Sequence, residues 1–372
     1  MVNKLFLLII IFLLGSFLLI GAPEGVETLE IGAKAPDFSL KGVDGEIHSL
    51  SDYDDSKILV IIFTANHCPT AQAYEGRMKK MAADYKDEDV QVVAISSNAP
   101  DALRLDEMGY TDLGDTYYEM KMRAEHMDFN FPYLYDGDKQ EAAKAYGPMA
   151  TPHVFIFDQS RKLRYVGRFD NSEHIEKVTS KDARNAIEAL LEGKEVPVKK
   201  TRVFGCSMKW AYKSDKSEQI EKQWENEPVK ISVANIDSVQ KIIENNSDDL
   251  RLINFWATWC GPCRVEFPDL VKVNYMYRNR NFEFITISLD TPENRENVLD
   301  FLQKQNASNR NYIFKGDKYK LMDKVDPEWP GSIPYTILIA PQGNVIFRKV
   351  GAFTNTLNLR REIVNFLGRT YQ

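Results

Sequence analysis

Two stretches of this sequence place a cysteine between an apolar run and a charged segment. Residues 253–268 read INFWATWCGPCRVEFP, and residues 61–76 read IIFTANHCPTAQAYEG. When Cys260 is aligned with Cys68, each cysteine has a Phe five residues before it and an Ala three residues before it. The second thiol of the later stretch, Cys263, falls opposite Ala71. The chain is therefore predicted to contain the same strand-to-helix cysteine site twice, once with two thiols and once with one.

The segments that follow each cysteine repeat the same order of predicted elements. Short β-branched and aromatic runs predict buried strands, and charged stretches at helical spacing separate them, which is typical of an α/β sandwich. The last two strands of each half predict a hairpin, and Pro152 or Pro334 precedes it. We therefore predict two tandem α/β folds, each a central mixed sheet flanked by helices. The predicted strands are 58–65, 90–96, 153–158 and 163–169, then 250–258, 282–289, 335–340 and 345–353.

Length and composition also favour two domains. The 372 residues, 44% of them hydrophobic, supply enough material for two separate cores. Residues 213–230 are polar and almost free of aliphatics, which indicates a linker or a solvated helix. We predict one domain over 30–212, a linker over 213–230 and a second domain over 231–372. The formal net charge of −7, without a Lys/Arg-rich run, argues against nucleic-acid binding.

The first 24 residues predict export, as a signal peptide or an N-terminal membrane anchor. Lys4 precedes a long apolar run that ends in Gly-Ala. Bulky Ile20 does not suit cleavage after Ala22, and the run is almost long enough to span a bilayer, so both forms stay open. Acidic residues after the run favour a periplasmic protein, either soluble or anchored to the inner membrane by residues 5–22.

The cysteines indicate redox chemistry. Four cysteines are too few for a disulfide scaffold in a chain of this size, and C-x-x-C beside a βα pattern is typical of thiol exchange. The N-terminus of a helix stabilises a thiolate, and a second thiol one turn away can release a partner from a mixed disulfide. A zinc site is not expected, because residues 229–372 contain no histidine and no other cysteine. We expect no metal and no other cofactor.

The second half resembles the thioredoxin superfamily, and INFWATWCGPCRVEFP is similar to its TlpA-like thiol-disulfide oxidoreductases. This resemblance covers roughly 229–372. It implies that Cys260 is the attacking thiol and Cys263 the resolving thiol. It also implies a substrate-binding surface at Trp259, Ile333 and Pro334, with Pro334 in cis facing the cysteines.

The residue Glu266 matches a glutamate that handles protons beside the thiols in TlpA-like proteins. The alternative is a solvated carboxylate in the first turn of the helix. Thioredoxins themselves carry a buried Asp six residues before the first cysteine, where this chain has Asn254. This difference favours the TlpA-like branch.

The first half resembles peroxiredoxins of the AhpC/TSA type over about 30–212, and more particularly a branch with an N-H-C-P loop. The resemblance implies a second thioredoxin-like fold, with Cys68 as the redox-active thiol and Thr151 and Pro152 at the substrate site. The stretches that carry it are IGAKAPDFSLKGVDGEIHSLSDY (31–53), FTANHCPTAQAYEGRM (63–78), YGPMATPHVFIFD (146–158) and GCSMKW (205–210).

The chain departs from true peroxiredoxins at the positions that orient a peroxide. A Pro seven residues and a Thr or Ser three residues before the cysteine are replaced by Ile61 and Ala65, although Thr64 lies one place away. Peroxidase activity is therefore in question. Cys68 still precedes a predicted helix and adjoins His67, which favours a lowered thiol pKa, and the alternative is an inert buried cysteine.

Two further groups in the first half carry open alternatives. Cys206 is either the resolving partner of Cys68 or a buried thiol. A metal site formed by Cys68, His67 and His153 lacks a fourth ligand and is not expected.

The predicted function is thiol-disulfide exchange at Cys260 and Cys263, coupled to a monothiol redoxin site at Cys68. In this relay Cys260 attacks oxidised Cys68, across a flexible linker, and Cys263 releases the pair. One alternative is a thiol peroxidase reduced by its fused thioredoxin domain. Another is a non-catalytic N-terminal module that delivers a client such as apocytochrome c. Expected partners are protein thiols and disulfides, peroxide or apocytochrome c, an external thiol reductant, and the membrane if the N-terminal segment is uncleaved.

Overall fold

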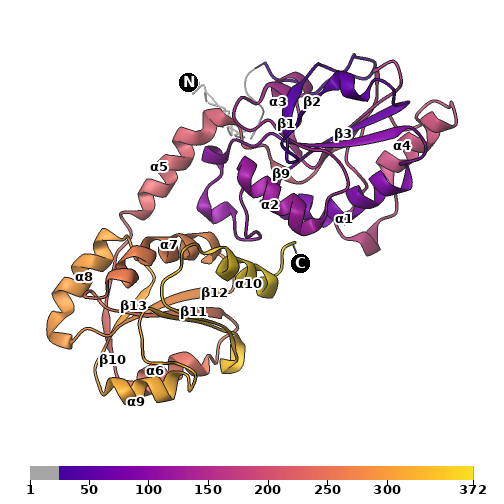
Figure 1. Ribbon diagram of the computed structural model, residues 1–372. Coiled ribbons are helices and arrows are strands. Elements are labelled where there is room, and N and C mark those ends of the chain that lie inside the picture. Colours follow the sequence, from indigo (N-terminus) through magenta and orange to yellow (C-terminus); the bar gives the residue numbers. More distant parts are fainter. Residues whose placement is uncertain (1–24, 372) are drawn as a thin grey trace, which may run out of the picture.

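The computed structural model describes residues 25–371. The predicted signal or anchor segment, residues 1–24, lies outside the described residues. Across residues 25–371, no helix is both long enough and apolar enough to cross a bilayer. Figure 1 shows that the described chain forms two α/β units in tandem, joined by helix α5 (Ser214–Trp224).

The N-terminal unit is built on a mixed sheet with the strand order β2-β1-β5-β4-β3-β7-β8. Its central strand β3 (Ile58–Thr64) pairs in parallel with β4 (Val90–Ser96) and antiparallel with β7 (His153–Phe157). Every residue of β3 is buried, which explains why its sequence is continuously apolar rather than alternating. The other strands of this sheet are β1 (Ser39–Gly42), β2 (Ile47–Ser49), β5 (Tyr133–Tyr135) and β8 (Leu163–Gly167).

Helices cover both faces of this sheet. One apolar cluster joins the sheet to α1 (Pro69–Asp84), α2 (Tyr117–Met127) and α4 (Asp182–Leu191). A second cluster, on the opposite face, includes α3 (Glu141–Tyr146). Two short strands, β6 (Ala150–Thr151) and β9 (Cys206–Ser207), form a separate antiparallel pair beside the start of α1.

The C-terminal unit has the sheet order β10-β13-β12-β11-β14-β15. Its central strand β11 (Leu250–Trp256) pairs in parallel with β12 (Phe282–Ser288) and antiparallel with β14 (Tyr335–Ile339). The other strands are β10 (Ser232–Ala234), β13 (Arg310–Phe314) and β15 (Val345–Val350). Helices α7 (Gly261–Tyr277), α8 (Arg295–Lys304) and α10 (Leu357–Leu367) pack on one face, and α6 (Ile236–Glu244) and α9 (Lys318–Val325) pack on the other.

The two units share one topology from the central strands to the final hairpin. The order β4-β3-β7-β8 of the first sheet corresponds to β12-β11-β14-β15 of the second, with the same parallel and antiparallel pairings. In each unit a cysteine helix, α1 or α7, follows the central strand. The predicted fold class, two tandem thioredoxin-like folds with mixed sheets and flanking helices, is confirmed for the described residues.

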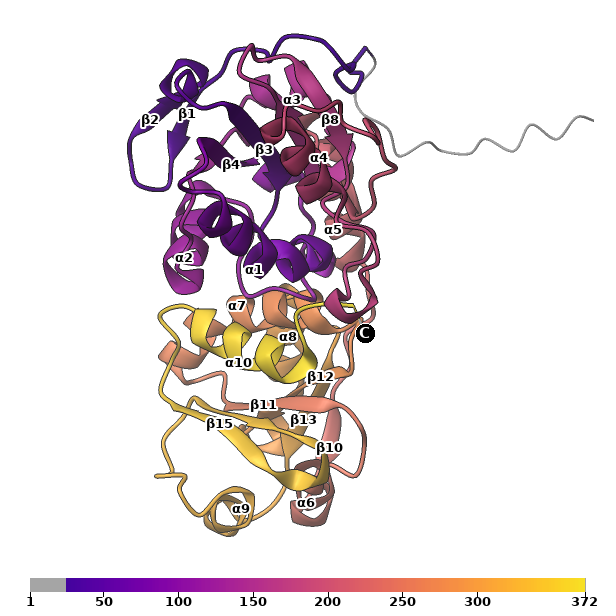
Figure 2. The same ribbon diagram turned by 90° about the vertical axis from the view of Figure 1, so that its right-hand side faces the viewer.

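The interface between the units is formed by helix α7, helix α10 and a loop of the N-terminal unit (Figure 2). Leu103, Leu105 and Met108 of this loop pack against the apolar cluster around α7. The carboxylate of Asp112, which is fully buried, accepts hydrogen bonds from Arg361 (3.2 Å) and Arg369 (2.5 Å) of the C-terminal unit. The interface therefore combines apolar packing with a buried ionic clamp.

Two hydrogen bonds to backbone carbonyls reinforce this interface. The Tyr277 hydroxyl donates to the carbonyl of Thr111 at 2.7 Å, and the Arg280 guanidinium donates to the carbonyl of Gly109 at 2.7 Å. Both donors lie at the C-terminal end of α7 or just beyond it. This end of α7 is therefore fixed against the N-terminal unit.

The segment predicted as linker or solvated helix, residues 213–230, contains helix α5. Ser217 donates a hydrogen bond to the carbonyl of Ala102 (3.0 Å), while the Trp224 ring stacks on Tyr275 of the C-terminal unit with centroids 4.6 Å apart. The helix thus contacts both units. The flexible tether on which the relay hypothesis depends is not what this segment forms in the described structure.

We predict that Asp112→Asn loosens the interface, because it removes the charge that Arg361 and Arg369 share in a buried position. The free energy of opening should fall by about 1–3 kcal/mol. Amide hydrogen exchange over residues 109–116 should accelerate about tenfold or more. The matched control is Asp269→Asn, whose pair with Lys272 is exposed. Equal exchange rates in the two variants would contradict the clamp.

Candidate redox sites

The C-terminal cysteine site lies where β11 ends and α7 begins. Cys260 caps the helix, is joined to Cys263 by a disulfide, and its sulfur accepts a hydrogen bond from the Cys263 N–H at 3.3 Å. The same sulfur lies 3.7 Å from the carbonyl oxygen of Ile333. The Ile333–Pro334 bond is cis, as predicted. The side chain of Trp259 is 66% exposed beside the disulfide.

The two sulfurs of this disulfide differ in access. Cys263 is fully buried, whereas Cys260 keeps 6% of its surface exposed. Ile333 is half-buried, so it leaves apolar surface beside Cys260. An attacking group that arrives from solution therefore meets Cys260 first, beside Trp259 and Ile333.

Glu266 is buried, so its interpretation as a solvated carboxylate is wrong. One carboxylate oxygen accepts from the Asn254 side chain at 3.0 Å, and the other accepts from the Phe353 N–H at 2.8 Å. Burial raises the pKa of Glu266 to about 7, and these two hydrogen bonds lower it by less. Because Glu266 follows Cys263 by three residues on α7, both side chains lie on one face of the helix. A carboxyl group that titrates near neutrality thus lies on the thiol-bearing face.

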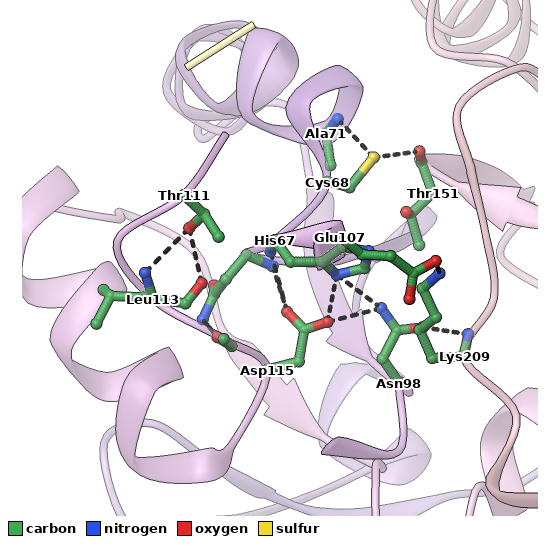
Figure 3. A network of polar contacts seen from close by, with 12 residues as sticks. His67, Cys68, Ala71, Asn98, Glu107, Thr111, Leu113, Asp115, Thr151 and Lys209 are labelled. Carbon is green, nitrogen blue, oxygen red and sulfur yellow. Dashed lines mark hydrogen bonds and ion pairs between the residues drawn. The ribbon is translucent and has the colours of Figure 1, made fainter. Parts of the chain in front are cut away.

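The N-terminal cysteine site repeats this geometry. Cys68 caps α1, and its sulfur accepts from the Ala71 N–H at 3.3 Å and lies 3.3 Å from the carbonyl oxygen of Thr151 (Figure 3). The Thr151–Pro152 bond is also cis. Thr151 and Pro152 are buried, because β9 pairs with the strand that contains Thr151. The surface that the resemblance assigned to substrate binding is therefore covered by the chain itself.

A second thiol reaches Cys68 from a distant part of the sequence. Cys206 lies opposite Thr151 in the β6–β9 pair and packs against Cys68, Ala65 and Ala71. Among the described residues, Cys68 and Cys206 are free thiols. Of the two alternatives for Cys206, the structure favours the partner of Cys68. Cys206 thus brings a second thiol to the site that the sequence predicts as monothiol, next to Ala71.

A buried ion pair lies beside Cys68. The Nδ1 atom of His67 lies 2.6 Å from a carboxylate oxygen of Asp115, which also accepts from the Asn98 side chain at 2.8 Å (Figure 3). The other carboxylate oxygen accepts from the backbone N–H groups of Asn66 (2.8 Å) and His67 (3.2 Å). Burial lowers the pKa of His67, but the charge of Asp115 outweighs it and the net pKa is raised. The ion pair with Asp115 therefore favours the protonated form of His67.

The charge of His67 acts on Cys68. Burial raises the pKa of the Cys68 thiol, but the hydrogen bond from Cys206, the His67 charge and the Thr151 and Ala71 contacts together bring it below its ordinary value. The pKa of Cys206 is raised by its hydrogen bond to Cys68 and by burial. Cys68 is thus the thiolate of the pair, and Cys206 keeps its proton. This polarity argues against an inert buried cysteine at position 68.

The position of His153 does not suit a shared metal site with Cys68 and His67. Its Nδ1 atom accepts from the Met149 N–H at 3.2 Å, and its ring packs on Phe155 with centroids 4.6 Å apart. Within residues 25–371, no group of three or more His, Cys, Asp or Glu side chains has a metal-binding arrangement.

Sequence reasoning missed Asp115 and Asn98, which orient His67. Both lie in irregular segments that show no periodic pattern, and each meets His67 only through the fold. The one signal in the sequence is that His67 adjoins Cys68. If His67 stabilises a thiolate there as a buried imidazolium, it requires an acidic partner.

We predict that Asp115→Asn raises the pKa of Cys68 by about one to two units, because His67 loses the anion that keeps it charged. The rate of Cys68 alkylation by iodoacetamide, followed by peptide mass spectrometry, should show its midpoint at higher pH. The control is Asp87→Asn, which changes an exposed carboxylate. A midpoint that stays at the wild-type pH would refute the role of the ion pair.

Comparison with known proteins assigns each unit to a family. The AhpC/TSA family model matches residues 31–166, and the Redoxin family model matches residues 218–364. The thiol-disulfide oxidoreductase ResA of Oceanobacillus iheyensis is 31% identical over 104 residues, which is 28% of this chain and 50% of the relative. The thiol:disulfide interchange protein HelX of Rhodobacter capsulatus is 28% identical over 107 residues, or 28% of this chain and 54% of HelX. The chain spans about half the length of these curated relatives.

Two solved structures are each similar to about half of this chain. A hypothetical protein from Sinorhizobium meliloti is 33% identical, with a TM-score of 0.45, and covers 50% of this chain and 97% of its own. An uncharacterized conserved protein from Geobacillus kaustophilus is 38% identical, with a TM-score of 0.44, and the match covers 50% of this chain and 94% of that protein.

The predicted resemblance to redoxins in both halves is confirmed by the two family matches. The strand order and the cysteine-capped helix of each unit agree with these assignments. The chain therefore belongs to the thioredoxin-like redoxins and consists of two of them in tandem, an AhpC/TSA domain followed by a Redoxin domain.

Proposed function

We propose that this chain is a thiol-disulfide oxidoreductase whose C-terminal domain exchanges disulfides with proteins through Cys260 and Cys263. The observation that carries this proposal is the disulfide at the start of α7, with Cys260 slightly exposed beside Trp259 and Cys263 fully buried. In the reduced domain, the Cys260 thiolate attacks a substrate disulfide and one substrate sulfur leaves as a thiolate. Cys263 then attacks the Cys260 sulfur, which closes the protein disulfide and releases the second substrate sulfur.

Glu266 handles the proton in this cycle. Cys263 must lose its proton before it attacks, and the nearby carboxylate with a pKa of about 7 is half ionised at neutral pH. The carboxylate is held by Asn254 and the Phe353 N–H, which keeps it on the thiol-bearing face of α7. Its role is to accept the Cys263 proton as the mixed disulfide resolves.

The N-terminal domain is proposed as a second dithiol site, formed by Cys68 and Cys206. The support is the packing of the two sulfurs, the lowered pKa of one and the raised pKa of the other. An oxidant that converts the Cys68 thiolate to a sulfenic acid would let Cys206 attack, giving a Cys68–Cys206 disulfide and water. A module that only binds clients has no need of a stabilised thiolate, so this observation disfavours the client-delivery alternative.

The relay between the two domains gains no support from the arrangement of the helices. Cys260 lies at the start of α7, while Met276 and Arg280, at and beyond the end of α7, line a cavity together with Cys206. The 17 residues of α7 separate its ends by about 25 Å. Direct attack of Cys260 on Cys68 would therefore require the interface to open, and we propose that the two sites work independently.

Export to the periplasm also remains a proposal, which rests on residues 1–24. Two of the relatives are named as a thiol-disulfide oxidoreductase and a thiol:disulfide interchange protein, which favours protein thiols and disulfides as partners of this chain as well. A peroxide is a second candidate substrate for Cys68, although Ile61 and Ala65 occupy the positions of the peroxide-orienting groups.

We predict that Cys260→Ser lowers dithiothreitol-driven insulin reduction by at least a hundredfold, because the attacking thiolate is lost. Cys68→Ser is the matched control and should keep most of the wild-type rate, since it changes the other domain. Retention of more than a few per cent of the activity in Cys260→Ser would overturn the assignment.

We predict that Glu266→Gln removes an inflection near pH 7 from the rate at which the Cys260 mixed disulfide is resolved. The ionised carboxylate accepts the Cys263 proton above that pH, so the wild-type rate should rise through pH 7, whereas the glutamine variant should lack this rise. The rate is measured by the release of a thionitrobenzoate label from Cys260. Asp269→Asn, an exposed carboxylate on the same helix, should keep the inflection.

A further inference from the structure

A pocket of about 310 Å³, which is open to solvent, lies between the domains beside Cys206. Its walls come from five parts of the chain, namely residues 67–69, 106–110, 206–209 and 276–280, and Tyr371. The residues on which the argument rests are His67, Tyr110, Cys206, Lys209, Arg280 and Tyr371. Cys206 lines this cavity and is partly exposed, whereas Cys68 is fully buried.

Arg280 holds the walls of this cavity together. Its guanidinium donates to the carbonyls of Gly109 (2.7 Å) in the N-terminal domain and of Gly368 (3.1 Å) after helix α10. The same group lies over the Tyr110 ring, 3.9 Å from its centroid. The Tyr371 ring packs edge-on against Tyr110 with centroids 4.9 Å apart. The C-terminal domain and the tail of the chain therefore form one side of the approach to Cys206.

The size of the cavity limits what can react there. A volume of about 310 Å³ lies at the lower end of the range found for small-molecule sites. A small molecule fits this volume, whereas a folded protein reaches Cys206 only past the residues that line the pocket, Arg280 and Tyr371 among them. The lining carries both signs of charge, since Lys209 forms an ion pair with Glu107 at 2.5 Å and both residues line the cavity. Such a lining is polar and suits a small polar molecule.

We propose that this cavity is the substrate site of the Cys68–Cys206 pair, that it takes low-molecular-weight polar thiols in preference to folded proteins, and that Cys206 is the sulfur they attack. This inference rests on the proposed function of Cys68 and Cys206 as a dithiol. It assigns the two domains different substrates, because Cys260 lies beside the exposed Trp259, whereas Cys206 lines a pocket between the domains.

The order of attack follows from access and from the leaving group. In the oxidised pair, the thiolate of a small thiol attacks the Cys206 sulfur, the new mixed disulfide forms, and Cys68 leaves as a thiolate. Exchange is fastest when the leaving thiol is the one that His67 and the start of α1 stabilise as an anion. A second small thiolate then attacks the outer sulfur of the mixed disulfide. The products are a small disulfide and the Cys206 thiolate, which takes up a proton, while Cys68 stays ionised.

The arrangement reverses the order found in the C-terminal domain. There, the attacked sulfur is Cys260, which caps the helix, and the buried sulfur Cys263 is the leaving group. In the N-terminal domain, the cysteine that caps the helix is the buried one, and the exposed sulfur comes from β9.

The test uses the full chain with Cys260→Ser and Cys263→Ser, so that thiol-disulfide exchange can occur only at Cys68 and Cys206. After mild oxidation, peptide mapping checks that the Cys68–Cys206 disulfide has formed. Reduction of this disulfide is then timed with free cysteine and, separately, with reduced thioredoxin. We expect cysteine to act at least tenfold faster than thioredoxin at equal thiol concentration. If no Cys68–Cys206 disulfide forms, the proposed dithiol and this inference both fail. If it forms and thioredoxin is as fast as cysteine, only this inference fails.

Variants of the residues that line the cavity test whether access to Cys206, rather than its intrinsic reactivity, sets the preference for small thiols. Arg280→Ala should raise the ratio of the thioredoxin rate to the cysteine rate about tenfold, and Tyr371→Ala, which changes only the tail, should raise it in the same direction. The control Arg310→Ala removes an Arg whose partner is Glu283, away from the cavity, and should leave the ratio unchanged. A ratio that is the same in all of these variants would overturn the role of the wall.

Trapping identifies the attacked sulfur. In the same background, Cys68→Ser treated with cystine should carry a cysteinyl group on Cys206, and Cys206→Ser should leave Cys68 unmodified over the same time. Modification of Cys68 at the faster rate would overturn the assigned order of attack.

Discussion

The structure depends on a contact that occurs once in each domain, the hydrogen bond from a backbone N–H to the sulfur of a cysteine that caps a helix. Ala71 donates to Cys68 and Cys263 donates to Cys260, each at 3.3 Å. The partial positive charge at the helix N-terminus stabilises a negative thiolate at this position. The carbonyl before a cis-proline then faces the same sulfur in both domains. Everything that distinguishes the two sites is added around this shared frame.

The additions differ in kind. In the C-terminal domain the second sulfur, that of Cys263, belongs to the same helix. The nearby ionisable group is Glu266, whose pKa is raised to about 7, and the exposed Trp259 lies beside the disulfide. In the N-terminal domain the second sulfur arrives on β9, and the nearby ionisable group is the cation His67, paired with Asp115. A cation lowers the pKa of a thiol that burial would otherwise raise, so this domain keeps a thiolate in a fully enclosed position.

The interface makes the two sites unequal. The Asp112 clamp, the Tyr277 and Arg280 hydrogen bonds and helix α5 hold one end of α7 against the N-terminal domain. The opposite end of α7 carries Cys260, beside the exposed Trp259. One helix therefore carries the Cys260–Cys263 disulfide at its start and lines the pocket beside Cys206 at its end.

The sequence by itself determined the duplicated fold, the cysteine-capped helices and the two prolines before the hairpins. These features are local, since apolar runs, helical spacing and W-C-G-P-C each lie within a few turns of chain. Short strands such as β1, β5, β10 and β13 were missed, because three to five residues carry too little pattern to separate from a loop. Only the tertiary structure decided that Cys206 completes the Cys68 site, that Asp115 charges His67, that Glu266 is buried and that α5 is a docked helix. Each of these depends on burial or on contacts between residues far apart in the chain. The local spacing of residues in the sequence shows neither burial nor such contacts.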